Sequence, residues 1–277
     1  PSTQCWGIAW SPSLSTFVAV NPLSTTLITS AQGLIANSTY SSWIGSSTSY
    51  VDTWYDQSGN NFHATQSTTA NQPVYNGTLR LLDFSTQYSF LNMGTASAGP
   101  IPTGTLNAQY TFVAKHGATG SISVDGGIIV AGGAAAVNQL NGIGVFPNYA
   151  NYWYDNDMAN IATSVSGNTF VVQYDGTNRI GYVNNNMTLT AAGSGYTVAS
   201  GYQQYIGRDS RGESSSFKGQ LYNIFIFGTS LSDSDRFACT SNPTDLNIKY
   251  DGSTSYLYNG SLNVPVSYTH LTLPTNR

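Results

Sequence analysis

The chain has 277 residues, of which 13% are aromatic and only 8% are charged, with a formal net charge of −4. Soluble domains usually contain about a quarter charged residues, so hydroxyl and amide groups must keep this protein soluble. The nine Lys and Arg residues are scattered and form no basic stripe, which argues against a nucleic-acid partner. No apolar run approaches the ~18 residues of a membrane span. These features predict an extracellular or surface-exposed protein.

Residues 1–45 are predicted to form an N-terminal extension. A Trp-Ser-Pro turn at 10–12 precedes a strand pattern, Phe-Val-Ala-Val, at 17–20, and the pair resembles one segment of a propeller blade. Because a single copy cannot close a propeller, we expect these residues to add strands to the main domain. The alternative is that further blades precede Pro1.

The stretch 51–66, VDTWYDQSGNNFHATQ, is the most informative part of the chain. It opens with alternating apolar and polar residues typical of a strand. A dense group of turn-forming residues follows at 56–61, and a second short strand begins at His63.

Further strand patterns follow at 72–75, 79–84, 89–93, 110–115, 128–130, 169–174, 179–183, 202–206 and 220–227, and two more flank Pro147. Tyr110, Phe112 and Ala114 are expected to share one face. The Asp-Gly pair at 175–176 predicts a hairpin, and Ser232 is expected to cap a short helix whose first turn is acidic. Frequent turn signals and little helical periodicity predict an all-β sandwich of two antiparallel sheets.

Residues 54–60, WYDQSGN, followed by ATQ at 64–66, resemble the opening signature of concanavalin A-like domains of the laminin-G type. The core YDQSG also resembles a segment of arabinofuranosidase B-type catalytic sandwiches. Residues 206–210, 217–227 and 231–233 resemble the closing strands of the same domains. The resemblance implies a concanavalin A-like jelly-roll sandwich over residues 46–242, a fold that hosts lectins, adhesion modules and hydrolases.

The C-terminal part has two segments. Residues 243–264 contain a pattern similar to the family's opening strand, so they are either a closing strand of the first domain or the start of a second tandem copy. Residues 265–277 resemble translated sequencing-adapter sequence, and we expect this tail to be artefactual. The chain is therefore expected to be part of a longer multidomain protein.

Catalysis is not predicted. Glycoside hydrolysis needs two carboxyl groups, and the chain has one glutamate, Glu213. Asp155 and Asp157 would share a face if they lay on a strand, and the alternative is a solvated turn. No histidine cluster or nucleophile elbow is visible.

Sugar binding needs flat aromatic faces beside amide and carboxylate groups. The residues predicted to bind a ligand are Tyr152, Trp153, Tyr154, Asp155, Asp157, Arg208 and Asp209. Alternation places Tyr152 and Tyr154 on one face and Trp153 on the other, so one of these sets is expected to pack in the core. Arg208 and Asp209 could instead form a local ion pair.

A calcium ion is the one cofactor that the sequence suggests. Hard oxygen ligands suited to Ca²⁺ crowd one loop, at Asp56, Ser58, Asn60 and Asn61, and the resemblance implies calcium at one end of the sandwich. The alternative is an Asx-type turn in which Asp56 accepts backbone N–H groups.

Covalent features are consistent with secretion. Cys5 and Cys239 could form a disulfide, or both could be buried thiols. Acceptor patterns for N-glycosylation occur at Asn37, Asn76, Asn186 and Asn259.

The predicted function is an extracellular, non-catalytic carbohydrate-binding or adhesion module of a larger protein. Its expected partners are a glycan or neighbouring extracellular subunits. Two alternatives stay open: a structural subunit of an extracellular fibre, sheath or virion appendage, and a glycoside hydrolase of the arabinofuranosidase type.

Overall fold

The computed structural model describes most of residues 48–241, with gaps at 49, 57–59, 77–78, 80, 86–87, 96–98, 105–107, 121–126, 146–147 and 194–196. Outside this stretch it describes the backbone of six strands: β1 (Gly7–Ser11), β2 (Thr16–Val20), β3 (Leu27–Ala31), β18 (Ile248–Tyr250), β19 (Ser255–Leu257) and β20 (Ser267–Leu271).

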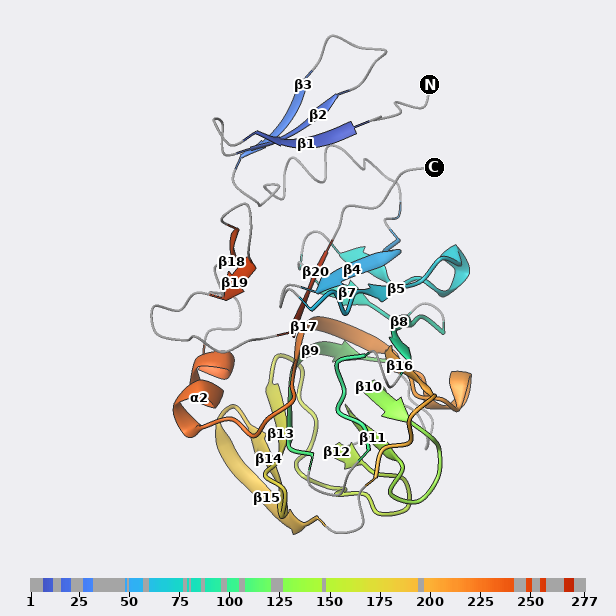
Figure 1. Ribbon diagram of the computed structural model, residues 1–277, viewed down its shortest axis with the longest axis vertical. Helices are drawn as coiled ribbons and strands as arrows, with labels where there is room; N and C mark the ends of the chain where they lie inside the picture. Colours follow the sequence, from blue (N-terminus) through green and yellow to red (C-terminus); the bar gives the residue numbers. More distant parts are fainter. Residues whose placement is uncertain are drawn as a thin grey trace.

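Two antiparallel sheets of seven strands each form a β-sandwich, as the sequence predicts (Figure 1). Sheet I has the order β6 (Val74–Asn76), β7 (Leu81–Asp83), β17 (Gly219–Phe227), β9 (Tyr110–Thr119), β13 (Thr169–Tyr174), β14 (Asn178–Val183), β15 (Asn186–Ala192). Sheet II has the order β4 (Thr53–Asp56), β5 (Ala64–Thr65), β8 (Leu91–Thr95), β16 (Gln203–Ile206), β10 (Ile128–Gly133), β11 (Leu140–Val145), β12 (Tyr149–Tyr152).

The terminal strands pair in three ways. β1, β2 and β3 pair with one another in a sheet of their own, so they add no strand to sheet I or sheet II, contrary to our expectation. β18 and β19 form a hairpin within the segment 243–264. β20 pairs with both β17 and β4 and so connects the two sheets.

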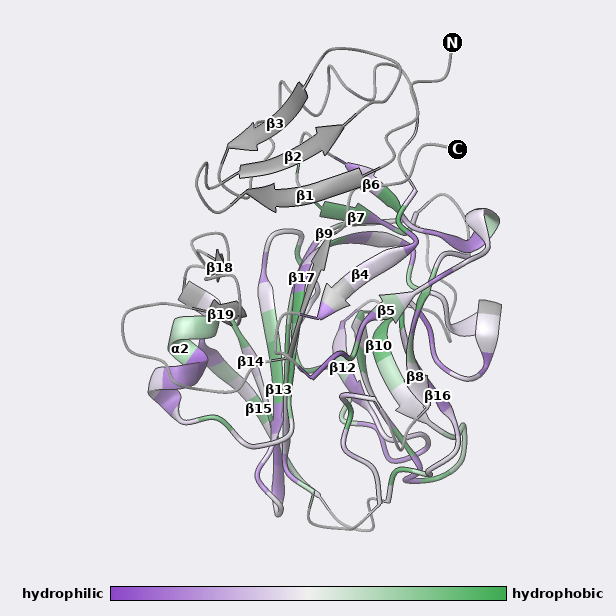
Figure 2. Ribbon diagram, turned by 45° about the horizontal axis from the view of Figure 1, so that its top comes forward, coloured by the Kyte–Doolittle hydropathy of each residue, from purple (hydrophilic) through white to green (hydrophobic). Residues whose placement is uncertain are grey.

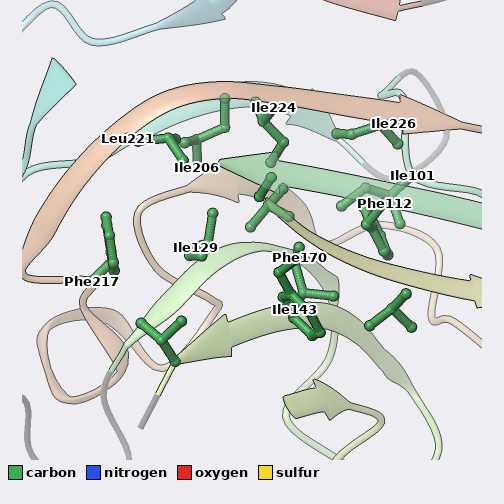
Figure 3. Packing of buried hydrophobic residues seen from close by; sticks show 14 of the residues in the cluster. Ile101, Phe112, Ile129, Ile143, Phe170, Ile206, Phe217, Leu221, Ile224 and Ile226 are labelled. Atoms are coloured by element: carbon green, nitrogen blue, oxygen red, sulfur yellow. The ribbon is translucent and has the colours of Figure 1, made fainter. Parts of the chain in front are cut away.

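The shared interior follows from the period-two alternation of side chains along strands. On β9, Tyr110, Phe112 and Ala114 point into the sandwich, as predicted, whereas Val113 points outward. Figure 3 shows the interior side chains of sheet I, including Phe112 and Phe170, packed against Ile129 and Ile143 of sheet II.

A helix, α2 (Asp233–Ser241), lies on the outer face of sheet I (Figure 2). It buries Leu231 and Cys239 against outward-facing apolar side chains of β9, β13 and β17. Ser232 caps the helix as predicted, because its Oγ accepts the N–H of Asp235 at 3.2 Å, and Asp233 adds an acidic first turn. No helix in the described part of the chain is long and apolar enough to cross a membrane.

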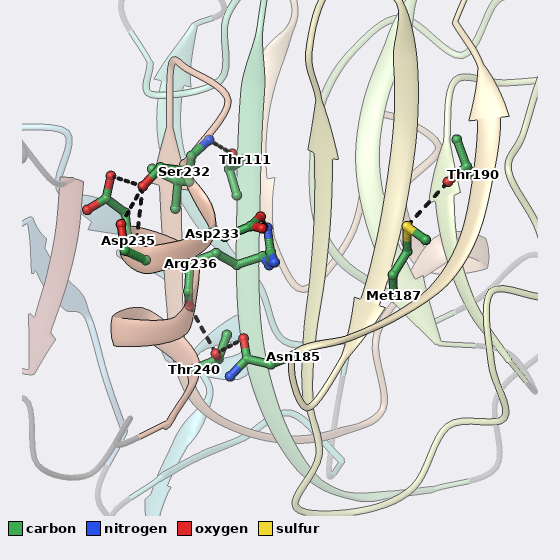
Figure 4. Close-up of polar contacts among 11 residues, drawn as sticks. Thr111, Asn185, Met187, Thr190, Ser232, Asp233, Asp235, Arg236 and Thr240 are labelled. Carbon is green, nitrogen blue, oxygen red and sulfur yellow. Dashed lines mark hydrogen bonds and ion pairs between the residues drawn. The ribbon is translucent and has the colours of Figure 1, made fainter.

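Polar contacts attach α2 to the sheet (Figure 4). The Arg236 guanidinium lies 3.8 Å from the centre of the Tyr182 ring and forms an ion pair of 2.8 Å with Asp233. The Thr240 hydroxyl donates to the Asn185 side chain in the β14–β15 turn. The helix therefore closes the outer face of sheet I, which leaves sheet II as the face free of a helix among the described residues.

Two tight turns shape the far end of sheet I. In the predicted β13–β14 hairpin, the Asp175 carboxylate accepts the N–H groups of Thr177 and Asn178 at 2.8 and 2.7 Å. The next turn contains Asn184 and Asn185 with φ of 48° and 67°, a left-handed conformation that asparagine tolerates. The strand β15 that follows it was not predicted, although Met187, Leu189 and Ala191 alternate with polar residues along it and most of its residues are exposed.

Buried polar side chains cross the interior in two hydrogen-bonded groups. The Tyr110 hydroxyl donates to Asn151 Oδ1 at 2.9 Å and accepts the indole N–H of Trp153 at 3.0 Å. His116 Nε2 lies 2.6 Å from the Tyr149 hydroxyl. Burial raises the pKa of Tyr110 and lowers the pKa of His116, so both side chains stay uncharged near neutral pH.

The packing of the interior can be tested with a matched pair of valines. Val172 is fully buried, whereas Val137 is 55% exposed. Val172→Ala should lower the free energy of unfolding by about 2 kcal/mol, through lost apolar burial and a cavity. Val137→Ala should change it by less than about 0.5 kcal/mol. Urea denaturation measures both, and equal effects would contradict the assigned interior.

His116 makes stability depend on pH. Its folded pKa lies below the ordinary value of 6.5, so as the pH falls below about 6.5 the unfolded chain binds a proton that the folded chain does not. Stability should therefore decrease as the pH falls through this window. His116→Phe should flatten the dependence of the unfolding free energy on pH between 6.5 and 5, measured by urea denaturation. An unchanged slope would show that other groups cause it.

Candidate functional site

The outer face of sheet II carries a row of side chains set by strand register. Tyr152 lies opposite Gly142, Gly142 opposite Ala131, and Ala131 opposite Tyr205. The row continues to Asn92, which is opposite Tyr205. Directly opposed residues on antiparallel strands point to the same face. We call these five residues the tyrosine row.

The neighbouring residues on the same strands point into the interior, which confirms that the tyrosine row faces outward. Ile143, Val130 and Ile206 are paired with one another across β11, β10 and β16 and all belong to the buried interior. The two tyrosines of the row are separated by three strand spacings, which places their backbones about 14 Å apart. Between them, Gly142 and Ala131 are buried.

Small residues let the tyrosine rings lie against the sheet. A Cβ added at Gly144 would be 3.0 Å from Cε2 of Tyr152, and one at Gly142 would be 2.7 Å from the Ala131 Cβ. Tyr152 and Tyr154 are half-buried and pack on a small apolar cluster formed by Ile128, Ala131 and Leu140. Each ring therefore has a fixed position and keeps part of its surface open to solvent.

Arg208 packs on the other end of the row. Its guanidinium carbon lies 3.5 Å from the centre of the Phe90 ring and 4.4 Å from that of Tyr205. Phe90 and Tyr205 meet edge to face, with ring centres 5.6 Å apart. Stacking of this kind is favourable and fixes the plane of the guanidinium.

The loop after β16 is braced by a second arginine. Arg211 donates from Nε and Nη2 to the buried Asp209 carboxylate at 2.9 and 2.8 Å, and its guanidinium lies 5.7 Å from the Tyr154 ring. The alternative in which Asp209 pairs with Arg208 is therefore wrong, since Arg211 is the partner. The loop therefore places Arg208 beside Tyr205 and Arg211 near Tyr154.

The remaining aromatic and acidic candidates lie elsewhere. Trp153 is fully buried in the interior. The strand ends at Tyr152, and Tyr154 and Asp155 have φ of 61° and 55°, so Asp155 and Asp157 do not lie on a strand. Asp157 accepts the backbone N–H of Trp153 at 2.8 Å, and Asp155 is exposed. The solvated-turn alternative describes this segment.

Asp56 of the predicted calcium loop contacts the described part of the loop beyond residue 59. The Asp56 carboxylate accepts the N–H of Phe62 at 3.0 Å, and the Asp56 N–H donates to His63 Nδ1 at 3.2 Å. Asn61 has a left-handed φ of 61°, and Ser58 lies outside the described residues. Within the described chain no three His, Cys, Asp or Glu residues gather in a way that would hold a metal ion. Asn60 is exposed, and calcium binding stays a prediction.

Cys239 is buried on α2, and burial raises the pKa of its thiol to about 12. Cys5 lies outside the described residues, so the disulfide stays a prediction.

The glycosylation positions differ in accessibility. Asn186 is exposed at the start of β15, and Asn76 accepts the N–H of Leu79 at 3.0 Å. Asn37 and Asn259 lie outside the described residues.

Two of the predicted ligand-binding groups come together on one face of sheet II: the tyrosines 152 and 154, and the loop of Arg208 and Asp209. Sequence reasoning missed Phe90, Tyr205 and Arg211. The alternation of 203–206 was a usable signal for Tyr205. Its neighbour Ile206 points into the interior, so Tyr205 points to the outer face of sheet II. Nothing in the sequence indicated that Phe90 lies beside it.

Solved structures share this fold. The chain is similar to a GH54 α-L-arabinofuranosidase soaked with a cyclic sulfate inhibitor, with a TM-score of 0.59, 14% identity, and coverage of 78% of this chain and 56% of that one. It spans little more than half of that enzyme's length. At this identity the likeness concerns the fold alone.

Two carbohydrate-binding neighbours are more distant. Domain 4 of AbnA, a GH43 extracellular arabinanase from Geobacillus stearothermophilus in complex with arabinotriose, has a TM-score of 0.45 at 11% identity, covering 70% of this chain and 99% of that one. The Ruminococcus gnavus IT-sialidase CBM40 bound to α2,3-sialyllactose has a TM-score of 0.38 at 15% identity, covering 48% and 83%. No protein-family model and no curated protein matches the sequence.

A substitution of Asp56 tests whether its loop binds calcium or whether Asp56 only accepts a backbone N–H group. Asp56→Ala should destabilise the protein by about 2 kcal/mol, because the N–H of Phe62 loses a charged acceptor. The loss should be the same in excess EDTA and in millimolar CaCl₂, measured by thermal and urea unfolding of both proteins. Stabilisation of the parent chain by calcium that disappears in the variant would instead make Asp56 a metal ligand.

Proposed function

We propose that this chain is an extracellular, non-catalytic carbohydrate-binding module of the concanavalin A-like, laminin-G type, and that its glycan lies along the tyrosine row. The observation that carries the proposal is that two half-buried tyrosines, Tyr152 and Tyr205, lie in one register row, with Arg208 stacked on Tyr205 and Arg211 near the adjoining Tyr154.

Sugar rings present a flat face of C–H groups that packs on aromatic rings, while their hydroxyls need hydrogen-bonding partners. Tyr152 and Tyr205 offer both a ring face and a hydroxyl. Asn92, at the end of the row, adds an amide group. Because the rings are already positioned by packing on the sheet, little side-chain entropy is lost when a ligand binds.

A binding role rather than hydrolysis is supported by the state of the nearest carboxylate. Asp209 is buried and uses both oxygens in contacts with Arg211, so it is held as an ion-pair partner. Hydrolysis would need two carboxyl groups on opposite sides of one glycosidic bond. The described residues place no such pair on the tyrosine row.

Substitution of either tyrosine of the row should weaken binding without unfolding the protein. On a glycan array of neutral and acidic oligosaccharides, the parent chain should bind at least one class. Tyr152→Ala and Tyr205→Ala should each weaken binding of the best ligand about tenfold in calorimetry, by loss of ring stacking.

The matched control is Tyr222→Ala, since Tyr222 is a half-buried tyrosine of sheet I that contacts Lys115. This variant should bind normally. Binding that is lost in the control but kept in the two row variants would move the site to the other sheet, and no binding by the parent chain would refute the proposal.

A further inference from the structure

We propose that Arg208 recognises a carboxylate, so that the ligand of the tyrosine row is an acidic saccharide. This inference rests on the proposed function and specifies the chemistry of its ligand. It comes from the difference between Arg208 and the other arginines that the structure describes.

Three of these arginines already have polar partners. Arg211 pairs with Asp209, and Arg236 pairs with Asp233. Arg179 donates to the backbone carbonyl of Asn156 at 2.8 Å. Each of these guanidiniums therefore has at least one polar partner within the fold, although Nε of Arg179 and Nε of Arg236 are, like that of Arg208, buried without a partner.

Arg208 makes no hydrogen bond or ion pair with any residue of the described chain, and its contacts there are with the rings of Phe90 and Tyr205. Its Nε is buried without a partner. The two terminal nitrogens, Nη1 and Nη2, also make no hydrogen bond with the described residues, and they are not among the buried atoms, so these are the donors that a ligand could reach. The side chain is thus held in place by the two rings while its hydrogen-bonding edge stays unused.

The geometry of this group fits a carboxylate. A guanidinium presents parallel N–H donors that match the two oxygens of a carboxylate in a bidentate contact. Stacking on one face leaves that edge available and fixes its plane. The neighbouring rings also exclude water, which strengthens the attraction to an anion.

Among the side chains that the structure describes, no carboxylate pairs with Arg208. The adjacent carboxylate, Asp209, is bonded to Arg211. A second cation lies on the neighbouring backbone segment: Phe217 donates its N–H to the Gly207 carbonyl at 2.8 Å, and Lys218, the next residue, lies 5.1 Å from the Tyr88 ring. In a chain of net charge −4, this is a local site where an anion is favoured.

The test compares each acidic oligosaccharide with its own neutral form. Oligosaccharides ending in glucuronate, galacturonate or sialate are titrated in calorimetry beside their carboxyl-reduced counterparts. The parent chain should bind at least one acidic form ten or more times more tightly than its reduced form. Arg208→Gln should remove this preference, and Arg208→Lys should restore it only in part, because lysine lacks the planar fork.

The matched control is Lys115→Gln, which removes the same unit of charge from sheet I and should keep the preference. Circular dichroism and urea unfolding check that each variant is folded. Equal binding of acidic and reduced forms, or an equal loss of both in Arg208→Gln, would overturn the inference and leave the proposed carbohydrate site standing. Absence of binding to any saccharide would overturn both.

Discussion

The alternation of side chains along the strands of sheet II determines both the interior of this protein and its candidate binding surface. Ile143, Val130 and Ile206 fill the interior from the same strands whose intervening residues, Gly142 and Tyr205 among them, face outward. A shift of one residue in any pairing would exchange the two sets. The burial of apolar side chains therefore fixes the register, and the register in turn sets the positions of the tyrosines. The surface needs no separate stabilisation of its own.

Local patterns in the sequence were sufficient to predict much of this fold. Alternation identified β9 and its inward face, the Asp-Gly pair identified the β13–β14 hairpin, and Ser232 identified the start of α2. Each of these signals arises from residues close together in the chain. The strand β15 was missed although Met187, Leu189 and Ala191 alternate with polar residues along it; it lies at the edge of sheet I and is mostly exposed.

The candidate site was predicted only in part, because some of its contacts join segments that are far apart in the sequence. Tyr152 and Tyr154 were found because aromatic and amide residues cluster in one short segment. The contact of Arg208 with Phe90 depends on the pairing of β16 with β8, strands separated by more than a hundred positions in the chain. Asp209 was predicted to bind a ligand, with an ion pair to the adjacent Arg208 as the alternative, whereas its partner is Arg211. Asp155 and Asp157 were considered on the assumption that the strand continues, but left-handed residues end its regular course.

Two glycines of sheet II, Gly142 and Gly144, permit close packing around them because they have no side chain. At position 142 even a methyl group would collide with the backbone oxygen of Val130 and with Ala131, and at position 144 it would push against the ring of Tyr152. The lack of a side chain at these two positions therefore permits the close approach of β10, β11 and the Tyr152 ring. A larger residue at either position would change the shape of this surface without replacing any of its aromatic or charged groups.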